Sequence, residues 1–136
     1  MPQITRRYTF CAAHQYWNDN WDSDRNEKEF GKDIYVHGHN YTLDITVKGK
    51  INPENGFLIN LEKVDDTVNR LVKKLDHSQI EKDIEWFKGK QPSSENLTVY
   101  LWDNISKNIP SPAKLHRVRL HETPRIFTDY YGPENE

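Results

Sequence analysis

Apolar and polar residues alternate from Ile4 to His14, which is the two-residue period of a half-buried β-strand. Arg6 is the one charged residue on the apolar face, which otherwise consists of Ile4, Tyr8, Phe10, Ala12 and His14. The predicted strand therefore ends in a histidine on its buried face.

A second predicted strand has the same period and begins with two histidines. Its apolar face consists of His37, His39, Tyr41, Leu43, Ile45 and Val47. Two shorter strands are predicted nearer the C-terminus, from Lys114 to Glu122 and from Arg125 to Tyr131.

Two other stretches have the spacing of amphipathic helices. The first follows Asn60, a good capping residue, and its apolar stripe consists of Leu61, Val64, Val68, Leu71, Val72 and Leu75. The second begins near Pro92-Ser93-Ser94, where a serine can cap the free amides, and continues towards Pro110. Its apolar positions are Leu97, Tyr100, Leu101 and Ile105.

The segment from Gln15 to Lys32 has neither period and is rich in Asn and Asp, so it is predicted to be a long loop. Long loops in compact domains are often functional. The order strand, strand, helix, helix, strand, strand predicts an α+β fold, with an antiparallel four-stranded sheet and both helices on one face. Residues 1–136 have the size of a single domain.

Composition narrows the classes of partner. Nineteen basic against 21 acidic residues, without a basic block, disfavour nucleic acid but allow a small basic pocket for a phosphorylated ligand. Cys11 is the only cysteine, which excludes an internal disulfide and a zinc cage of thiolates. Apolar runs are short and the N-terminus lacks the core of a signal peptide, so we expect no membrane partner and a cytoplasmic location.

Three histidines are candidate metal ligands. His37 and His39 are two residues apart, so their rings point the same way on a strand, and Gly38 allows close approach to the backbone. His14 could complete a three-histidine site with a fourth position open to water or substrate, and neutral imidazoles favour zinc. The alternative is that each histidine ends a strand and hydrogen-bonds a nearby carbonyl.

Four more residues have both a functional and a structural interpretation. Asp76-His77 is either an acid/base pair or a helix end stabilised by a histidine cation. Glu122 lies on the apolar face of its strand, where a carboxylate must be paired or bind a polar group unless that end of the sheet is exposed. Glu95 either contacts a ligand or interacts with the dipole of the second helix.

Six blocks in this order resemble the 6-pyruvoyltetrahydropterin synthase / 6-carboxytetrahydropterin synthase family of pterin side-chain lyases. They are FCAAH at Phe10 to His14, HGHNY at His37 to Tyr41, GFLINL at Gly56 to Leu61, LDH at Leu75 to His77, PSSEN at Pro92 to Asn96, and HET at His121 to Thr123 with a following Tyr131-Gly132. Together they cover nearly the whole chain, whereas any one block alone would be weak support.

The resemblance implies a tunnel-forming T-fold that assembles into an oligomeric β-barrel, as a homotrimer or homohexamer with active sites between subunits. It implies a substrate, 7,8-dihydroneopterin triphosphate, whose triphosphate meets basic residues of the loop. It also implies three groups of site residues: zinc ligands His14, His37 and His39; an acid/base pair, Asp76 and His77; and pterin-binding residues Glu122, Glu95, Ser93 and Ser94.

Asp33 departs from the family pattern, because relatives place a catalytic cysteine four or six residues before the first histidine of HGH. Those positions are Asp33 and Gly31 here, and Cys11 is on the strand face opposite His14. A carboxylate with a reference pKa of about 4 is a weak base unless its surroundings raise that pKa.

Three hypotheses follow. In the first, Asp33 replaces the cysteine, as a glutamate does in a subgroup linked to forming 6-hydroxymethyl-dihydropterin for folate synthesis. In the second, Asp76-His77 alone transfers protons. In the third, the chain is a non-catalytic oligomer that binds pterin and zinc. The presence of all the other site residues favours a working lyase.

The motifs indicate two different pterin products. HGHNY and Asn60 resemble pyruvoyl-type members, which belong to tetrahydrobiopterin biosynthesis. The four-residue offset of Asp33 from His37 resembles carboxy-type members, which belong to queuosine biosynthesis.

Overall fold

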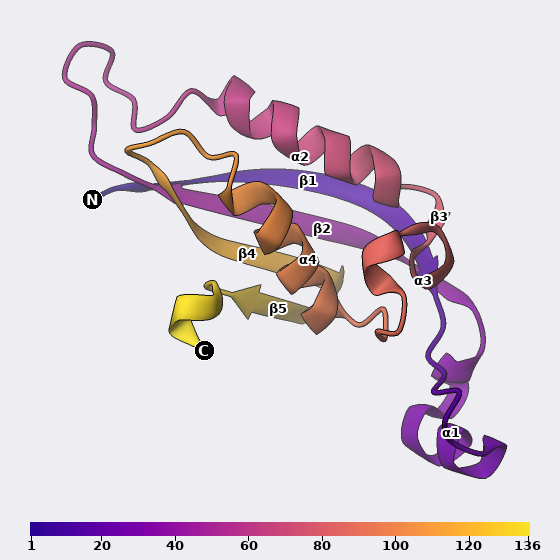
Figure 1. Ribbon diagram of the computed structural model, residues 1–136. Coiled ribbons are helices and arrows are strands. Elements are labelled where there is room, and N and C mark those ends of the chain that lie inside the picture. The colour runs from indigo at the N-terminus through magenta and orange to yellow at the C-terminus, as the bar shows by residue number, and fades with distance from the viewer.

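Five strands form one sheet in the order β3-β1-β2-β4-β5 in the computed structural model, which describes residues 1–136 (Figure 1). The strands are β1 (Gln3–His14), β2 (His37–Lys48), β3 (Ser78–Gln79), β4 (Lys114–Thr123) and β5 (Ile126–Tyr130). The four longer strands match the predicted ones and are antiparallel to their neighbours. The α+β class is therefore confirmed.

The prediction of an antiparallel four-stranded sheet was wrong by one strand. Ser78 and Gln79 of β3 pair in parallel with Ala12 and Ala13 of β1, so the sheet is mixed. Two residues are too few to show a period, which is why the sequence pattern did not reveal β3.

Two long helices, α2 (Leu61–Leu75) and α4 (Ser94–Ser106), cover one face of the sheet, as predicted (Figure 1). The Asn60 side chain caps α2 by accepting a hydrogen bond of 3.0 Å from the Glu62 amide. Ser93 caps α4 in the same way, with a bond of 3.2 Å from the Asn96 amide. Both predicted helix starts are confirmed.

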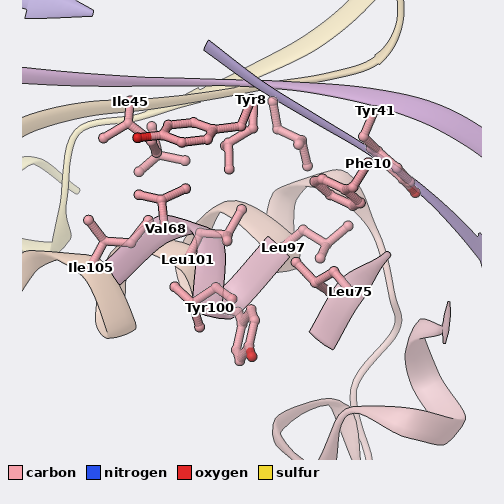
Figure 2. Packing of buried hydrophobic residues seen from close by; sticks show 14 of the residues in the cluster. Tyr8, Phe10, Tyr41, Ile45, Val68, Leu75, Leu97, Tyr100, Leu101 and Ile105 are labelled. Atoms are coloured by element: carbon pink, nitrogen blue, oxygen red, sulfur yellow. The ribbon is translucent and has the colours of Figure 1, made fainter. Parts of the chain in front are cut away.

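The hydrophobic core lies between this face of the sheet and the two helices (Figure 2). The sheet contributes buried residues that include Tyr8, Phe10, Tyr41 and Ile45, and the helices contribute Val68, Leu75, Leu97, Leu101 and Ile105. Each fully buried side chain of this size stabilises the fold by roughly 1.5–3 kcal/mol relative to exposure. Burial of these faces fixes which side chains point towards the helices.

Arg6, the charged exception on the apolar face, is explained by a partner on α2. Its guanidinium lies 3.3 Å from the Asp65 carboxylate, and the Tyr8 hydroxyl donates a hydrogen bond of 2.6 Å to the same group. The contact joins α2 to the outer part of β1.

The prediction of a loop from Gln15 to Lys32 was wrong in part, because the segment contains α1 (Ser23–Phe30), followed by the 3₁₀ helix η1 (Gly31–Ile34). Asp22 caps α1 by accepting from the Arg25 amide at 2.8 Å. Asn26 is fully buried and exchanges hydrogen bonds with the Asn18 backbone. A buried asparagine organises this helix instead of an apolar stripe, so the periodicity did not predict it.

Three further short elements lie outside the predictions: α3 (Ile80–Asp83) and the 3₁₀ helices η2 (Glu85–Phe87) and η3 (Pro133–Asn135). None of the helices has the length and apolar character needed to cross a membrane.

The face of the sheet away from α2 and α4 is polar. Arg7 binds the Asp44 carboxylate through two hydrogen bonds of 2.8 and 3.0 Å, and Arg119 binds Asp129 through two of 2.6 and 2.8 Å. These planar pairs hold neighbouring strands together on a face that no helix covers.

Candidate metal centre and acid/base pair

The three predicted histidines meet at one end of the sheet. The antiparallel register of β1 and β2 pairs His14 with His37 and Ala12 with His39, so the last residue of one strand lies beside the first residues of the other. One ring nitrogen from each of the three histidines lies within 4.8 Å of the others. The geometry therefore brings together the three imidazoles that the sequence proposed as ligands.

Backbone carbonyls orient two of these rings. Nδ1 of His14 lies 2.8 Å from the Pro92 carbonyl oxygen, and Nδ1 of His37 lies 2.8 Å from the Tyr35 carbonyl oxygen. A carbonyl only accepts, so each Nδ1 carries the hydrogen and each neutral ring keeps its lone pair on Nε2. In metal sites, a hydrogen bond from the ring nitrogen that does not bind the metal orients the histidine in the same way.

Burial lowers the pKa of His14 to about 4, whereas its bond to Pro92 acts in the opposite direction. The ring is thus neutral at physiological pH, which is the form that binds a metal. Its Nε2 atom is buried without a hydrogen-bond partner. An unpartnered buried nitrogen beside two other imidazoles fits a zinc ion, since zinc accepts three histidines in sites that keep a fourth position.

Glu122 points into the same cluster from β4. Its Oε1 atom lies 3.4 Å from Nε2 of His14 and 3.3 Å from Nε2 of His39. The β4–β5 register shifts between His121 and Thr123, and such irregularities commonly re-aim a side chain beside a functional site. Of the two interpretations of Glu122, a carboxylate that faces polar groups agrees with these contacts, and an exposed end of the sheet does not.

Asp33 lies at the rim of the cluster, in η1. Its Oδ1 atom is 3.6 Å from Nε2 of His37, and the side chain is 55% exposed. The Asp33 carbonyl also accepts a hydrogen bond of 2.8 Å from the Tyr16 amide, which ties η1 to the end of β1. The aspartate four residues before His37 therefore lies next to the histidine cluster.

Asp76 and His77 form a hydrogen-bonded pair beside β1. Oδ2 of Asp76 lies 2.9 Å from Nδ1 of His77, and Oδ1 accepts from the Cys11 amide at 2.8 Å. The bond from Cys11, and then that from His77, lower the pKa of Asp76. His77 has a positive φ of 62° and its side chain is 82% exposed. The Asp76 carboxylate thus orients the His77 ring through Nδ1, and the ring itself is exposed to solvent.

The pair lies beside β1 and borders a hollow that it shares with one of the three histidines, His39. A hollow of about 350 Å³ is lined by His77 and His39, together with Cys11 and Asn40, whose side chains lie on the face away from the helices. No hydrogen bond or ion pair connects Asp76 or His77 to His14 or His37. Within one chain the acid/base pair is thus not bonded to the histidine cluster, although His77 and His39 border the same hollow.

The PSSEN segment begins α4, as the sequence predicts, and lies against the histidine cluster through Pro92. Ser93 caps α4, Ser94 is buried with its hydroxyl unpartnered, and Glu95 is exposed in the first turn. Pro92, which was not a candidate, holds His14 through its carbonyl. A backbone carbonyl leaves no trace in residue type, so sequence reasoning could not find it.

Tyr16 is another residue that the sequence analysis missed. Its ring centre lies 4.9 Å from that of His14 and 6.4 Å from that of His37. Burial, and then the charges of nearby Glu122, Asp33 and Glu95, raise the pKa of Tyr16 above its usual value. Tyr16 is therefore a neutral phenol on the wall of the histidine cluster.

The fold is α+β with a mixed sheet, and at one end of that sheet three imidazoles and a carboxylate converge. This arrangement is typical of enzymes with a metal site. Residues 3–133 match the family model described as 6-pyruvoyl tetrahydropterin synthase. A 6-pyruvoyl tetrahydrobiopterin synthase from Drosophila melanogaster is 38% identical over 133 residues, covering 96% of this chain and 79% of the relative.

Two further relatives support the match. The solved 6-pyruvoyl tetrahydropterin synthase from Caenorhabditis elegans is 30% identical, with a TM-score of 0.89 and 97% of each chain covered. A dihydroneopterin monophosphate aldolase from Pyrococcus furiosus is 29% identical over 120 residues, covering 88% of this chain and 89% of the relative. The chain belongs to the 6-pyruvoyl tetrahydropterin synthase family, and it is an enzyme of the lyase class.

Proposed function

We propose that this chain is a zinc-dependent pterin side-chain lyase that acts on 7,8-dihydroneopterin triphosphate. The observation that carries the proposal is the convergence of His14, His37 and His39, with one ring nitrogen of each within 4.8 Å of the others, in a member of this family. The acid/base pair of Asp76 and His77 in the same chain supports catalysis rather than binding alone.

His14, His37 and His39 would hold the zinc ion. When bound, zinc acts as a Lewis acid that polarises oxygens of the substrate side chain and makes an adjacent carbon-bound proton more acidic. The carbonyls of Pro92 and Tyr35 keep the two Nδ1 atoms protonated, so that Nε2 is free on both rings.

His77 is the proposed proton acceptor. Asp76 fixes the ring through Nδ1, which directs the lone pair of Nε2 outwards and stabilises the imidazolium after proton uptake. The low pKa of Asp76 keeps its carboxylate ionised at physiological pH. The exposure of His77 supports its use in a site shared with a neighbouring subunit.

Asp33 is proposed to assist proton transfer from the position where relatives have cysteine. Its distance of 3.6 Å from His37 supports a place beside the reacting side chain. Asp33 would act on a substrate that covers this exposed carboxylate.

The pterin ring is proposed to lie between Glu122 and the start of α4, with Glu95, Ser93 and Ser94 on that side. A carboxylate can form paired hydrogen bonds with the guanidine-like edge of the ring. The unpartnered hydroxyl of buried Ser94 supports a polar ligand near this segment.

A second candidate function is the formation of a 6-hydroxymethyl pterin. A carboxylate instead of a thiol at position 33 favours it, and the Pyrococcus furiosus relative named as an aldolase is consistent with side-chain cleavage. Both candidates use the same zinc ligands and differ in which bonds of the side chain are broken.

Product identification separates these candidates. Zinc-loaded protein is incubated with 7,8-dihydroneopterin triphosphate, and the pterin is identified by chromatography and mass spectrometry. We expect a pyruvoyl or carboxy product under the first proposal and a hydroxymethyl product under the second. Absence of any turnover by the zinc-loaded oligomer would contradict both.

Two variants test the assigned roles. Asp33→Ala is expected to slow turnover while zinc content is unchanged, and an unchanged rate would exclude Asp33 as the base. His37→Ala is expected to lose the metal, and about one zinc per chain in this variant would contradict the proposed site.

The proposed trimer or hexamer, with sites between subunits, is tested by complementation. His37→Ala removes a metal ligand and His77→Ala removes the proton acceptor, so each variant alone is expected to be inactive. When the two variants are refolded together, some interfaces join a subunit that retains His37 to a subunit that retains His77. Recovered activity supports shared sites, and no recovery with mixed oligomers formed would contradict them.

A further inference from the structure

The carboxylate of Glu122 approaches two of the proposed metal ligands at once. Oε1 lies 3.4 Å from Nε2 of His14 and 3.3 Å from Nε2 of His39, and the Glu122 side chain is only 17% exposed. A carboxylate oxygen held this close to two imidazole nitrogens is either a hydrogen-bond acceptor or a co-ligand.

Nε2 of His14 cannot donate a hydrogen bond to Glu122, because the ring hydrogen is on Nδ1. Nδ1 donates to the Pro92 carbonyl, so the neutral ring has its lone pair on Nε2. Nε2 is buried and has no hydrogen-bond partner. A lone pair and a carboxylate oxygen at 3.4 Å repel each other, and a cation shared between them turns the contact into a favourable one.

The spacing also fits shared coordination. Zinc binds histidine nitrogen at about 2.0–2.1 Å and carboxylate oxygen at about 2.0–2.2 Å, so neighbouring ligand atoms of a tetrahedral site lie about 3.3–3.5 Å apart. Both distances from Glu122 fall in this interval.

Asp33 provides the contrast within the same site. Its carboxylate approaches only His37, at 3.6 Å, and is 55% exposed. Glu122 is less exposed and reaches two ligands from the part of β4 where the pairing with β5 is irregular.

We propose that Glu122 is the fourth ligand of the metal ion in the substrate-free protein, completing a set of His14, His37, His39 and Glu122. The carboxylate neutralises part of the metal charge and keeps water from the open position. The inference rests on the proposed function in one respect: to bind the pterin ring, Glu122 must leave the metal when substrate enters.

Metal titration of the full chain tests the inference without turnover. Protein stripped with a chelator is titrated with Zn²⁺ and with Co²⁺, comparing wild type, Glu122→Gln, Glu122→Asp and Asp33→Asn. We expect both Glu122 variants to raise the Kd at least about tenfold, because even outer partners of metal ligands contribute 10–100-fold. Asp33→Asn, which removes a nearby charge but no ligand, is expected to raise it less than about fivefold.

The visible spectrum of bound Co²⁺ reports the ligand set directly. We expect a changed spectrum for both Glu122 variants and the wild-type spectrum for Asp33→Asn. Glu122→Asp retains the charge but is one methylene shorter, so it separates ligation from electrostatics. Equal Kd values and spectra for wild type and both Glu122 variants would overturn the proposal.

Neopterin, which carries the hydroxylated side chain without phosphates, tests the release of Glu122. Added to cobalt-loaded wild type, it is expected to change the spectrum, and no change at saturating neopterin would overturn the exchange. The proposed function can fail independently. If the wild type converts no pterin but Glu122→Gln still weakens metal binding, the result contradicts the proposed function and supports Glu122 as a metal ligand.

Discussion

Nδ1 of His14 donates a hydrogen bond of 2.8 Å to the carbonyl oxygen of Pro92, which joins the end of β1 to the segment that starts α4. The bond links a candidate metal ligand to a helix that forms much of the core. It also leaves Nε2 as the nitrogen available to a metal.

Replacement of His14 is expected to cost stability even without metal. His14 is fully buried, whereas the His37 side chain is 28% exposed. His14→Ala leaves a cavity and an unpaired Pro92 carbonyl, so we expect a loss of roughly 2–4 kcal/mol in the free energy of unfolding. His37→Ala is the control, with an expected loss below about 1 kcal/mol. Urea denaturation of chelator-treated proteins measures both, and equal losses would contradict the buried role of His14.

Asp76→Asn is expected to impair turnover without affecting the metal. The amide keeps an acceptor for the Cys11 amide but loses the charge that orients and stabilises His77. We expect kcat to fall by about 10²–10⁴-fold, with zinc content unchanged. Asp103→Asn, at an exposed position of α4, is the control and should leave kcat unaffected. A wild-type kcat for Asp76→Asn would show that the pair has no catalytic role.

Gly132→Ala is expected to destabilise the C-terminal segment. Gly132 has φ 94°, and an added Cβ would clash with Cζ2 of Trp102. Gly89 has a similar φ of 78° with open space around it, so Gly89→Ala carries the backbone strain alone. We expect a loss of about 1 kcal/mol for Gly89→Ala and at least about 2 kcal/mol for Gly132→Ala. Thermal unfolding compares them, and a smaller loss at Gly132 would rule out the clash.

Stability is expected to fall in acid in part through Asp129. The paired hydrogen bonds from Arg119 hold the pKa of Asp129 below its usual value. The native state therefore favours the ionised form, and the added stability is present above about pH 4 and is lost as the pH falls through the lower native pKa.

Asp129→Asn tests this pH dependence. At pH 7 the variant should be less stable than wild type by roughly 1 kcal/mol, because the partly exposed pair is screened by water. The difference should shrink at pH 3 and below, as measured by urea denaturation across pH. A difference that does not depend on pH would assign the effect to packing rather than to charge.

The sequence predicted the long elements well because they carry a clear period. β1, β2, α2 and α4 each bury one face, and burial imposes alternation on strands and a stripe on helices. α1 and β3 were missed for the opposite reason: α1 depends on the buried side chain of Asn26, and β3 on two residues added to the edge of β1.

The sequence by itself determined the α+β class, the two capped helices and the residues that form the candidate site. Their spatial grouping needed the tertiary structure, since strand register places His14 beside His37 and the pairing of β4 with β2 brings Glu122 close to His14 and His39. Only the fold also placed His77 and His39 at the same hollow and selected Pro92 as a partner of His14. Residue types set which chemistry is available, whereas distances between residues far apart in the chain depend on packing and pairing, which no local pattern contains.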